Sequence, residues 1–305
     1  MLKIITWLWA QPNGRTTYTA HHVNIWAAML KRHLTIPFTL ACVTDMPDGI
    51  DSDIEIIDPP NDFVGIETPT WNKGKPNCFR RLVLFSPEAE KIFGAKRFAS
   101  MDLDAVVGAN VDDIFSKTED FIMYRGTNFD RPYNGSLVMM DAGARPQVYN
   151  EFSIENAIAS GQKYTGSDQA WIAYCLGTGE ATWSFEDGIC WWGSQYNTDI
   201  PEKKIMFFPG IIKPWEVIVL GVDKWCIEHY RGDKEGKCLI LGYGKNVWKE
   251  LESNLDSGPF DNYIISPEVS KHWPNGYIEV AANDKQAVLL SQMHGYKDYL
   301  FLGKS

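Results

Sequence analysis

Two aspartates, Asp102 and Asp104, follow an apolar segment at Arg97–Met101 with one residue between them. The apolar segment predicts a buried strand, so both carboxylates fall where that strand ends. Side chains alternate between the faces of a strand, but a bend at its end can bring two such carboxylates to one site. Two carboxylates suit Mg²⁺ or Mn²⁺, ions that usually also bind the phosphates of a substrate. By itself the pattern is common, and two solvated turn aspartates explain it more simply; the metal site becomes the better interpretation only with the motifs that follow.

The first hundred residues alternate between strand and helix, which determines where these aspartates lie. A helix is expected from about Ala20 to His33, and a second one from Phe79 to Phe85. The expected strands cover Lys3–Trp9, Pro37–Val43, Asp53–Ile57 and Arg97–Met101. This alternation predicts an α/β fold with a mainly parallel central sheet and helices on both faces. Ligands of such sheets bind beyond the carboxyl ends of the strands, where Asp45 and Asp102 are found.

The remaining chain is expected to complete this domain and to form a second, smaller one. Strands are predicted at 121–124, 136–140 and 203–208, helices at 150–160 and 168–176, and long loops at 177–198. A charged, glycine-flanked linker at 231–236 then separates a domain over 1–230 from a small α/β, Rossmann-like module over 237–305. That module alternates strands (238–241, 263–265, 277–281 and 299–302) with helices (245–255 and 284–293). We expect it to serve acceptor choice or assembly.

Composition excludes several classes of protein. The chain has 39 acidic and 29 basic residues, a formal charge of −10, which argues against general nucleic-acid binding. Its 45% apolar and 22% charged residues exclude a disordered chain. No apolar run approaches the length of a membrane span. The cysteines are too far apart for a structural zinc site, so we expect reduced thiols and a cytoplasmic protein.

Four further motifs follow Asp102 and Asp104 along the chain. They are Val111–Phe115, Tyr133–Met140, Gly166–Gln169 and Gly210–Trp215. In this order and at these spacings, the motifs resemble glycosyltransferase family 8, the glycogenin and bacterial galactosyltransferase-like group. The resemblance spans about residues 3–216. It implies a GT-A nucleotide-sugar-binding fold and transfer of a sugar with retention of its anomeric configuration.

The resemblance also implies roles for individual residues. It makes Asp102 and Asp104 the metal ligands, with Arg81 facing the nucleotide. It implies that Asn134, Gly135, Gly210 and Lys213 bind the donor. It implies catalytic roles for Asp168, Gln169 and Lys213. A lysine suits the diphosphate, which gains charge as the glycosidic bond breaks. Without the resemblance, Arg81 would be interpreted as a solvated helix residue, and Ser167 and Asp168 as helix caps.

One position departs from the family pattern. In the family, a histidine three residues before the glycine completes the metal site, and here Phe207 stands three residues before Gly210. Phenylalanine cannot bind a metal, so the site would use two aspartates with diphosphate and water, take a ligand from elsewhere, or hold no tight metal. Because Mg²⁺ accepts few protein ligands and several waters, a divalent cation, Mn²⁺ or Mg²⁺, is still expected.

The prediction is therefore a retaining glycosyltransferase that moves a sugar from a nucleotide-diphosphate donor, most simply UDP-linked, to an acceptor hydroxyl. One alternative is a non-catalytic nucleotide-sugar-binding or acceptor-recruiting protein, which the missing histidine favours. Another is a nucleotidyltransferase, which shares the use of two carboxylates, but the chain lacks a glycine-rich basic phosphate loop near its N-terminus. The acceptor stays open among a polysaccharide, a protein, a small molecule and, less readily, modified DNA.

Overall fold

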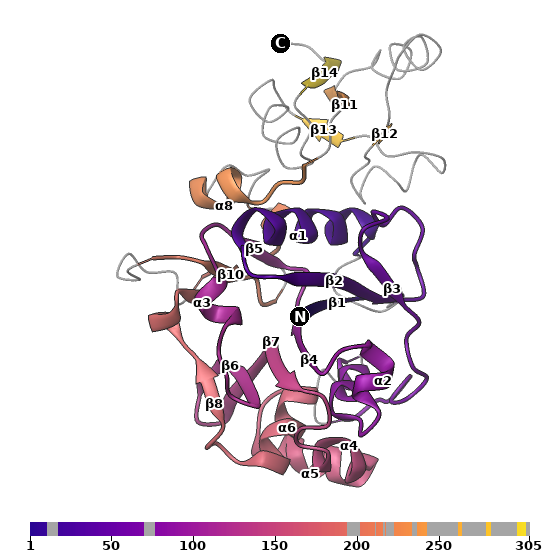
Figure 1. Ribbon diagram of the computed structural model, residues 1–305, viewed down its shortest axis with the longest axis vertical. Helices are drawn as coiled ribbons and strands as arrows, with labels where there is room; N and C mark the ends of the chain where they lie inside the picture. Colours follow the sequence, from indigo (N-terminus) through magenta and orange to yellow (C-terminus); the bar gives the residue numbers. More distant parts are fainter. Residues whose placement is uncertain are drawn as a thin grey trace. The chain divides into compact units, whose positions relative to one another are not determined.

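The computed structural model describes residues 1–10, 18–69, 77–193, 202–210, 212–215, 217, 223–233, 237–242, 262–263, 279–281 and 298–302 (Figure 1). The chain forms two compact units. The first unit comprises Met1–Val23, His33–Ala105 and Ala109–Phe207, and the second comprises Asn24–Arg32, Val106–Gly108 and Phe208–Ser305. The domain boundary expected at 231–236 thus falls inside the second unit, and an independent accessory module stays a prediction.

The first unit is built on a seven-stranded sheet with the order β3-β2-β1-β4-β7-β6-β8. Its strands are β1 (Leu2–Leu8), β2 (Phe38–Thr44), β3 (Glu55–Ile57), β4 (Arg97–Met101), β6 (Phe121–Asn128), β7 (Arg131–Asp141) and β8 (Ala181–Trp183). Neighbouring strands from β3 to β4 are parallel, as are β6 and β8, whereas β7 runs antiparallel to β4 and β6. The predicted α/β fold with a mainly parallel central sheet is confirmed.

Helices pack on this sheet through apolar side chains. The helical elements of the first unit include η2 (Phe79–Phe85), α2 (Ala89–Phe93), α3 (Asp112–Phe115), α4 (Gln147–Asn150), α5 (Ile154–Lys163) and α6 (Asp168–Leu176). The expected helix at 79–85 is a 3₁₀ helix. Figure 1 shows α4, α5 and α6 gathered beside β6 and β7. One core cluster joins Phe85 of η2, Phe98 of β4 and Trp171 of α6, so the elements that carry the candidate site share one packed core.

The prediction of long loops at 177–198 is wrong for residues 181–191. This stretch forms β8, a short 3₁₀ helix η3 (Phe185–Asp187) and β9 (Ile189–Trp191), and β9 pairs in parallel with β10 (Ile205–Phe207). Trp183 and Trp191 are buried. The physical reason is that aromatic side chains buried on a sheet stabilise short strands even where glycine and serine are frequent.

The second unit contains part of α1 (Ala20–His33), part of β5 (Ala105–Val107) and α8 (Lys224–His229). Asp223 caps the N-terminus of α8. Its carboxylate accepts a hydrogen bond from the backbone N–H of Cys226 at 3.1 Å. Parallel strands follow: β11 (Lys237–Gly242) pairs with β12 (Asn262–Tyr263), β13 (Glu279–Ala281) and β14 (Asp298–Leu302). These strands fall within or beside the expected segments, whereas the expected helices at 245–255 and 284–293 lie outside the described residues. Among the described helices, none has the length and apolarity needed to cross a membrane.

Candidate functional site

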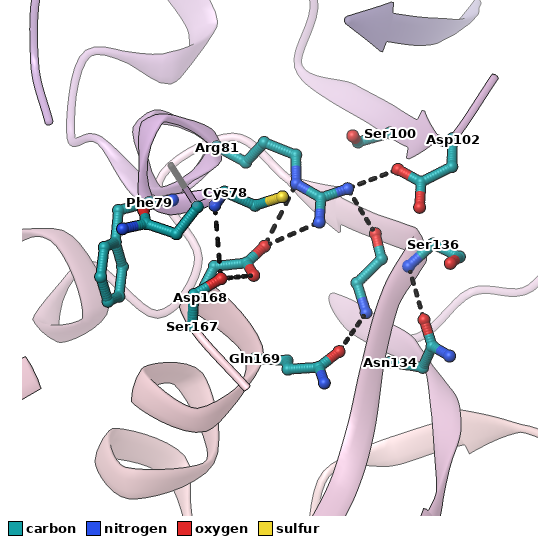
Figure 2. A network of polar contacts seen from close by, with 12 residues as sticks. Cys78, Phe79, Arg81, Ser100, Asp102, Asn134, Ser136, Ser167, Asp168 and Gln169 are labelled. Atoms are coloured by element: carbon teal, nitrogen blue, oxygen red, sulfur yellow. Dashed lines mark hydrogen bonds and ion pairs between the residues drawn. The ribbon is translucent and has the colours of Figure 1, made fainter. Parts of the chain in front are cut away.

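The guanidinium of Arg81 lies at the centre of a polar network at the end of β4 (Figure 2). Four elements supply this network. Arg81 lies on η2, Asp102 follows β4, Gly135 lies on β7, and Asp168 is the first residue of α6. The register of the sheet brings two of them together, because Met101 pairs with Leu137 and the backbone N–H of Asp102 donates to the carbonyl of Ser136 at 2.9 Å.

The N–H groups of the Arg81 guanidinium donate hydrogen bonds to three residues, Asp102, Gly135 and Asp168. Its Nη1 donates to Asp102 Oδ1 and to the carbonyl of Gly135, the latter at 3.2 Å. Its Nε donates to Asp168 Oδ2 at 3.1 Å, and its Nη2 lies 3.0 Å from the same oxygen. The Arg81 side chain is 11% exposed and that of Asp168 is 7% exposed. This arrangement is a buried, charge-assisted network in which one planar cation joins two carboxylates.

Burial and charge act in opposite directions on the ionisable groups of this network. Burial raises the pKa of the Asp102 carboxyl above its ordinary value, while Arg81 lowers it and the charge of Asp104 raises it further. Burial disfavours the charged form of Arg81, but Asp102 and Asp168 together hold its pKa well above the ordinary value. Burial also raises the pKa of the neighbouring Cys78 thiol to about 12, so this thiol stays neutral at physiological pH.

Two glycines allow these side chains to approach one another. A Cβ on Gly135 would lie 3.0 Å from Arg81 Nη2 and 3.2 Å from Asp168 Oδ2. A Cβ on Gly166 would lie 2.4 Å from Cγ of Gln169, and Gly166 has a positive φ of 130°. Gln169 in turn accepts a long hydrogen bond from the backbone N–H of Gly135, at 3.4 Å. The backbone is therefore close to the Arg81 guanidinium because no side chain separates them.

Ser167 fixes the orientation of Asp168. Its hydroxyl donates to Asp168 Oδ1 at 3.1 Å and accepts from the backbone N–H of Cys78 at 3.3 Å. Ser167 lies at the N-cap position of α6, but its side chain makes no capping hydrogen bond. The expectation that its side chain caps the helix is therefore wrong. Both oxygens of Asp168 therefore already have partners: Oδ1 is held by Ser167 and Oδ2 by Arg81.

Asn134 and Asp104 flank this network. The Oδ1 of Asn134 accepts from the backbone N–H of Ser136 at 2.9 Å, so its side chain turns back onto its own strand. Asp104 Oδ2 accepts a hydrogen bond from the hydroxyl of Tyr18 at 3.0 Å. Sequence reasoning missed Tyr18, because nothing in a single tyrosine before a helix links it to an aspartate 86 residues away.

Asp102 and Asp104 are the two carboxylates of this site that the family resemblance assigns to a divalent cation. Asp102 and Asp104 interact electrostatically, and three aspartates against one arginine give the cluster around Arg81 a formal charge of 1 − 3 = −2. Carboxylate oxygens are the ligands that Mg²⁺ and Mn²⁺ accept. Within the described part of the chain, no group of three His, Cys, Asp or Glu side chains could hold a metal. The aromatic ring of Phe207 is buried and packs against Tyr124, with 5.6 Å between the ring centroids.

Gly210 and Lys213 belong to the second unit. Gly210 has a φ of 93°, in the left-handed region that favours glycine. The ammonium of Lys213 donates to the carbonyl of Phe208 at 3.0 Å, and the residue is 5% exposed. The structure thus brings Arg81, Asp102, Gly135, Asp168 and Gln169 together in the first unit, and Gly210 and Lys213 are described separately as parts of the second.

No family model and no curated protein matches this chain. Among solved structures it is similar to the galactosyltransferase LgtC in complex with donor and acceptor sugar analogs, with 11% identity, a TM-score of 0.46 and coverage of 70% of this chain and 89% of that chain. It is also similar to the glycosyltransferase GlyE of Streptococcus pneumoniae TIGR4, with 11% identity, a TM-score of 0.45 and coverage of 100% and 82%. A third match is the bifunctional glycosyltransferase WbbM, with 10% identity, a TM-score of 0.43 and coverage of 70% and 46%.

Proposed function

We propose that this protein is a retaining glycosyltransferase that uses a nucleotide-diphosphate sugar as donor. The observation that carries the proposal is the Arg81-centred network. The family resemblance assigns Asp102 to the metal, Gly135 to the donor sugar and Asp168 to the reactive carbon, and one guanidinium contacts all three. Residues far apart in the sequence therefore meet where the chemistry would need them together.

In this proposal, the donor binds beyond the carboxyl end of β4. Asp102 and Asp104 would hold a divalent cation, which neutralises charge on the donor diphosphate when bound. The family resemblance assigns Gly135 to the segment along the donor sugar, and it assigns Lys213 the positive charge for the leaving diphosphate. The donor is expected to be UDP-linked, and the acceptor is an unidentified hydroxyl.

The surroundings of Asp168 favour a front-face mechanism. A double-displacement route needs a carboxylate that is free to form a bond to the anomeric carbon. Both oxygens of Asp168 are held, by Ser167 and by Arg81. We therefore assign Asp168 a positioning and electrostatic role. The acceptor oxygen forms its bond to the anomeric carbon as the bond to the diphosphate oxygen breaks. The acceptor proton passes to the diphosphate on the same face.

A second candidate function is non-catalytic binding of a nucleotide sugar. Two observations favour it: Phe207 is buried against Tyr124, and no cluster of three potential metal ligands occurs in the described segments. A protein of this kind would bind the donor and release nothing from it. The two functions therefore differ in donor consumption and agree in donor binding.

Thermal unfolding in the presence of nucleotide sugars tests the binding that both functions require. A ligand that binds only the native state raises the melting temperature. UDP-, GDP-, ADP- and CMP-sugars are compared with and without Mn²⁺, and we expect the largest rise with a UDP-sugar and Mn²⁺ together. If none of these donors shifts the melting temperature of the folded protein, both functions are wrong.

A further inference from the structure

We propose that the tip of the β6–β7 hairpin, Phe129 and Asp130, is an outer acceptor subsite, so that the acceptor is an extended neutral saccharide and not a small molecule. This inference rests on the proposed function, because it takes sugar transfer as the reaction and names the class of acceptor. It assigns a specificity-determining role to Phe129, a residue that none of the sequence motifs above contains.

The hairpin extends beyond the edge of the sheet where a donor would bind. β4 ends at Met101, which pairs with Leu137 of β7. The part of β7 that precedes Leu137, from Arg131 to Ser136, therefore continues past the carboxyl end of β4. Ligands of sheets of this kind bind beyond these carboxyl ends. The tip of the hairpin thus belongs to the ligand-binding end of the first unit.

Phe129 is the feature of this tip that the fold does not explain. The paired residues Asn128 and Arg131 leave a two-residue loop between them, and such loops favour glycine, asparagine and aspartate. Phe129 is 89% exposed, so its ring contributes almost nothing to the core. Exposed apolar residues are common on protein surfaces, so exposure alone does not identify a site. The position of Phe129 beside the candidate site is what distinguishes it.

Asp130 fastens the loop to the segment before α6. Its carbonyl accepts a hydrogen bond from the backbone N–H of Thr165 at 2.7 Å, and its carboxylate accepts one from the Thr165 hydroxyl at 3.2 Å. The carbonyl of Thr165 in turn accepts a hydrogen bond from Gln169 Nε2 at 3.4 Å. The loop that carries Phe129 is therefore connected by two hydrogen bonds to the segment that leads into Asp168 and Gln169.

A bulge in β6 determines the direction of the tip. The register of β6 and β7 shifts between Arg125 and Asn128, and a Cβ on Gly126 within this stretch would lie 1.7 Å from the carbonyl oxygen of Arg131. Glycine is therefore the residue that fits there. Bulges increase the local twist, and next to active sites they often change where a side chain points. The backbone of the hairpin thus supports Phe129 in a defined place.

The chemistry of the tip fits a neutral saccharide. A sugar ring has an apolar face of C–H groups, which packs on an aromatic ring, and hydroxyl groups, which pair with amide and hydroxyl side chains. The tip offers both, because the exposed residues Thr127 and Asn128 directly precede Phe129. The chain has a formal charge of −10, which disfavours acidic saccharides and anionic membrane surfaces.

The length of β7 makes this subsite an outer one. Arg131 and Gly135 are four residues apart on β7, and a strand rises about 3.3 Å per residue, so the strand puts about 13 Å between the turn and Gly135. This distance is longer than a single sugar ring. A saccharide that contacts both Gly135 and Phe129 must therefore consist of several linked sugar units.

Saccharide binding to the full chain tests the proposal without a transfer assay. Maltose, cellobiose and chitobiose are each compared with the corresponding hexamer by calorimetry and saturation-transfer NMR. We expect at least one hexamer to bind at least about tenfold more tightly than its dimer, and this advantage should fall to about twofold or less in Phe129→Ala. Phe129→Tyr keeps the aromatic face and should retain the advantage. Ile154→Ala, which removes an exposed apolar side chain from α5, is the matched control and should behave as the wild type.

Hexamers that bind no more tightly than their dimers would overturn the proposal. A folded Phe129→Ala that keeps the preference for hexamers would also overturn it. So would Phe129-dependent sedimentation with phosphatidylglycerol vesicles in a protein that binds none of the saccharides, because the tip would then be a membrane contact. Thermal unfolding with UDP-sugars on the same wild-type sample separates the two proposals. Donor binding without a preference for hexamers means that only this inference fails, whereas the absence of donor binding means that the proposed function fails.

Discussion

Arg80 and Arg81 are adjacent in the sequence, yet they lie in two very different environments. Arg80 faces Asp45, which is largely open to solvent, and its guanidinium lies 5.8 Å from the centroid of the Trp9 ring. Arg81 is enclosed by Asp102, Gly135 and Asp168, which come from three other elements of the fold. The two residues have the same side chain and lie on the same 3₁₀ helix, so the difference comes from the direction in which each side chain leaves the helix and from the elements that it meets there.

The comparison of the two arginines shows which ion pairs are costly to form inside this fold. The Arg80 side chain is itself only 13% exposed, but its partner Asp45 is 47% exposed and 3.7 Å away, so solvent screens this ion pair on one side. Breaking a buried pair costs about 3–5 kcal/mol, because it leaves a desolvated charge without a partner. A largely buried network in which one arginine joins two carboxylates is a poor way to gain stability, since burial itself penalises each charge in it. We therefore interpret the Arg81 network as functional, and the Arg80 pair as a single contact between a buried arginine and a solvent-exposed carboxylate.

The largest expected effect comes from removing the carboxylate of Asp102, the partner of Arg81. Removing the carboxylate of Asp45, the partner of Arg80, is the matched control. If Asp102 holds a divalent cation as proposed, Asp102→Asn should lower the rate of sugar transfer by at least about 10²-fold, because the site would lose a charged ligand. The backbone anchor to Ser136 remains, so the protein should still fold. The matched change Asp45→Asn should leave transfer within about twofold. Steady-state release of nucleoside diphosphate measures both variants, and near-normal activity of Asp102→Asn with Mg²⁺ or Mn²⁺ would remove the distinction between the two arginines.

Lys213 extends the comparison to a third cation. Like Arg81 it is buried, and its ammonium donates to the carbonyl of Phe208 at 3.0 Å. If it stabilises the leaving diphosphate, Lys213→Ala should lower turnover by roughly 10²–10³-fold and change donor affinity less. Lys91→Ala, on the surface of α2, is the control. Unchanged turnover with weaker donor binding would mean that Lys213 only binds the donor.

Gly135 determines whether Arg81 can keep its place. In Gly135→Ala the added methyl group would lie 3.0 Å from Arg81 Nη2, so either the guanidinium or Asp168 must shift. Overpacking of this kind costs about 1–3 kcal/mol, and we expect transfer to fall by about tenfold. Gly179→Ala is the control, since no atom lies within 4 Å of a Cβ added there. Thermal unfolding and turnover together measure the effect, and a fully active Gly135→Ala would show that the position of Arg81 is not critical.

The smallest expected effect concerns Asp104, which Arg81 does not hydrogen-bond in this structure. Tyr18→Phe removes the hydroxyl that donates to Asp104 at 3.0 Å, which corresponds to one hydrogen bond of about 1–3 kcal/mol to a charged acceptor. We expect a few-fold loss of Mn²⁺ affinity in the presence of UDP. Tyr149→Phe loses a comparable bond to Asp62, at 2.7 Å, and should leave Mn²⁺ binding unchanged. Equal results for both variants would show that Tyr18 does not position Asp104.

Much of the first unit could be predicted from the sequence because its elements have strong local patterns. The helix at Ala20–His33 and the strand at Arg97–Met101 have the predicted bounds, since apolar periodicity and turn residues define both. The strands at 181–191 were missed, because short strands stabilised by buried tryptophans have no periodicity long enough to detect. Local pattern is informative only where an element is long enough to repeat it.

The candidate site was predictable in its residue types and not in its geometry. Spacing and resemblance identify Asp102, Arg81 and Asp168, but the guanidinium that joins them depends on contacts between residues 21 and 87 positions apart. The same holds for Tyr18, whose partner Asp104 is set by the path of the chain. The interpretation of Arg81 from its sequence neighbours alone, as a solvated helix residue, is wrong. Its side chain is only 11% exposed in the structure.

The most direct test of retaining sugar transfer is proton NMR of a UDP-sugar incubated with the wild-type protein and Mg²⁺, with water or an added sugar as acceptor. The account predicts that the anomeric signal of the donor declines and that the first new anomeric signal has the configuration of the donor. Asp102→Asn should leave the donor signal unchanged over the same period. A folded wild type that binds the donor but never consumes it, or a first product of inverted configuration, would contradict the account.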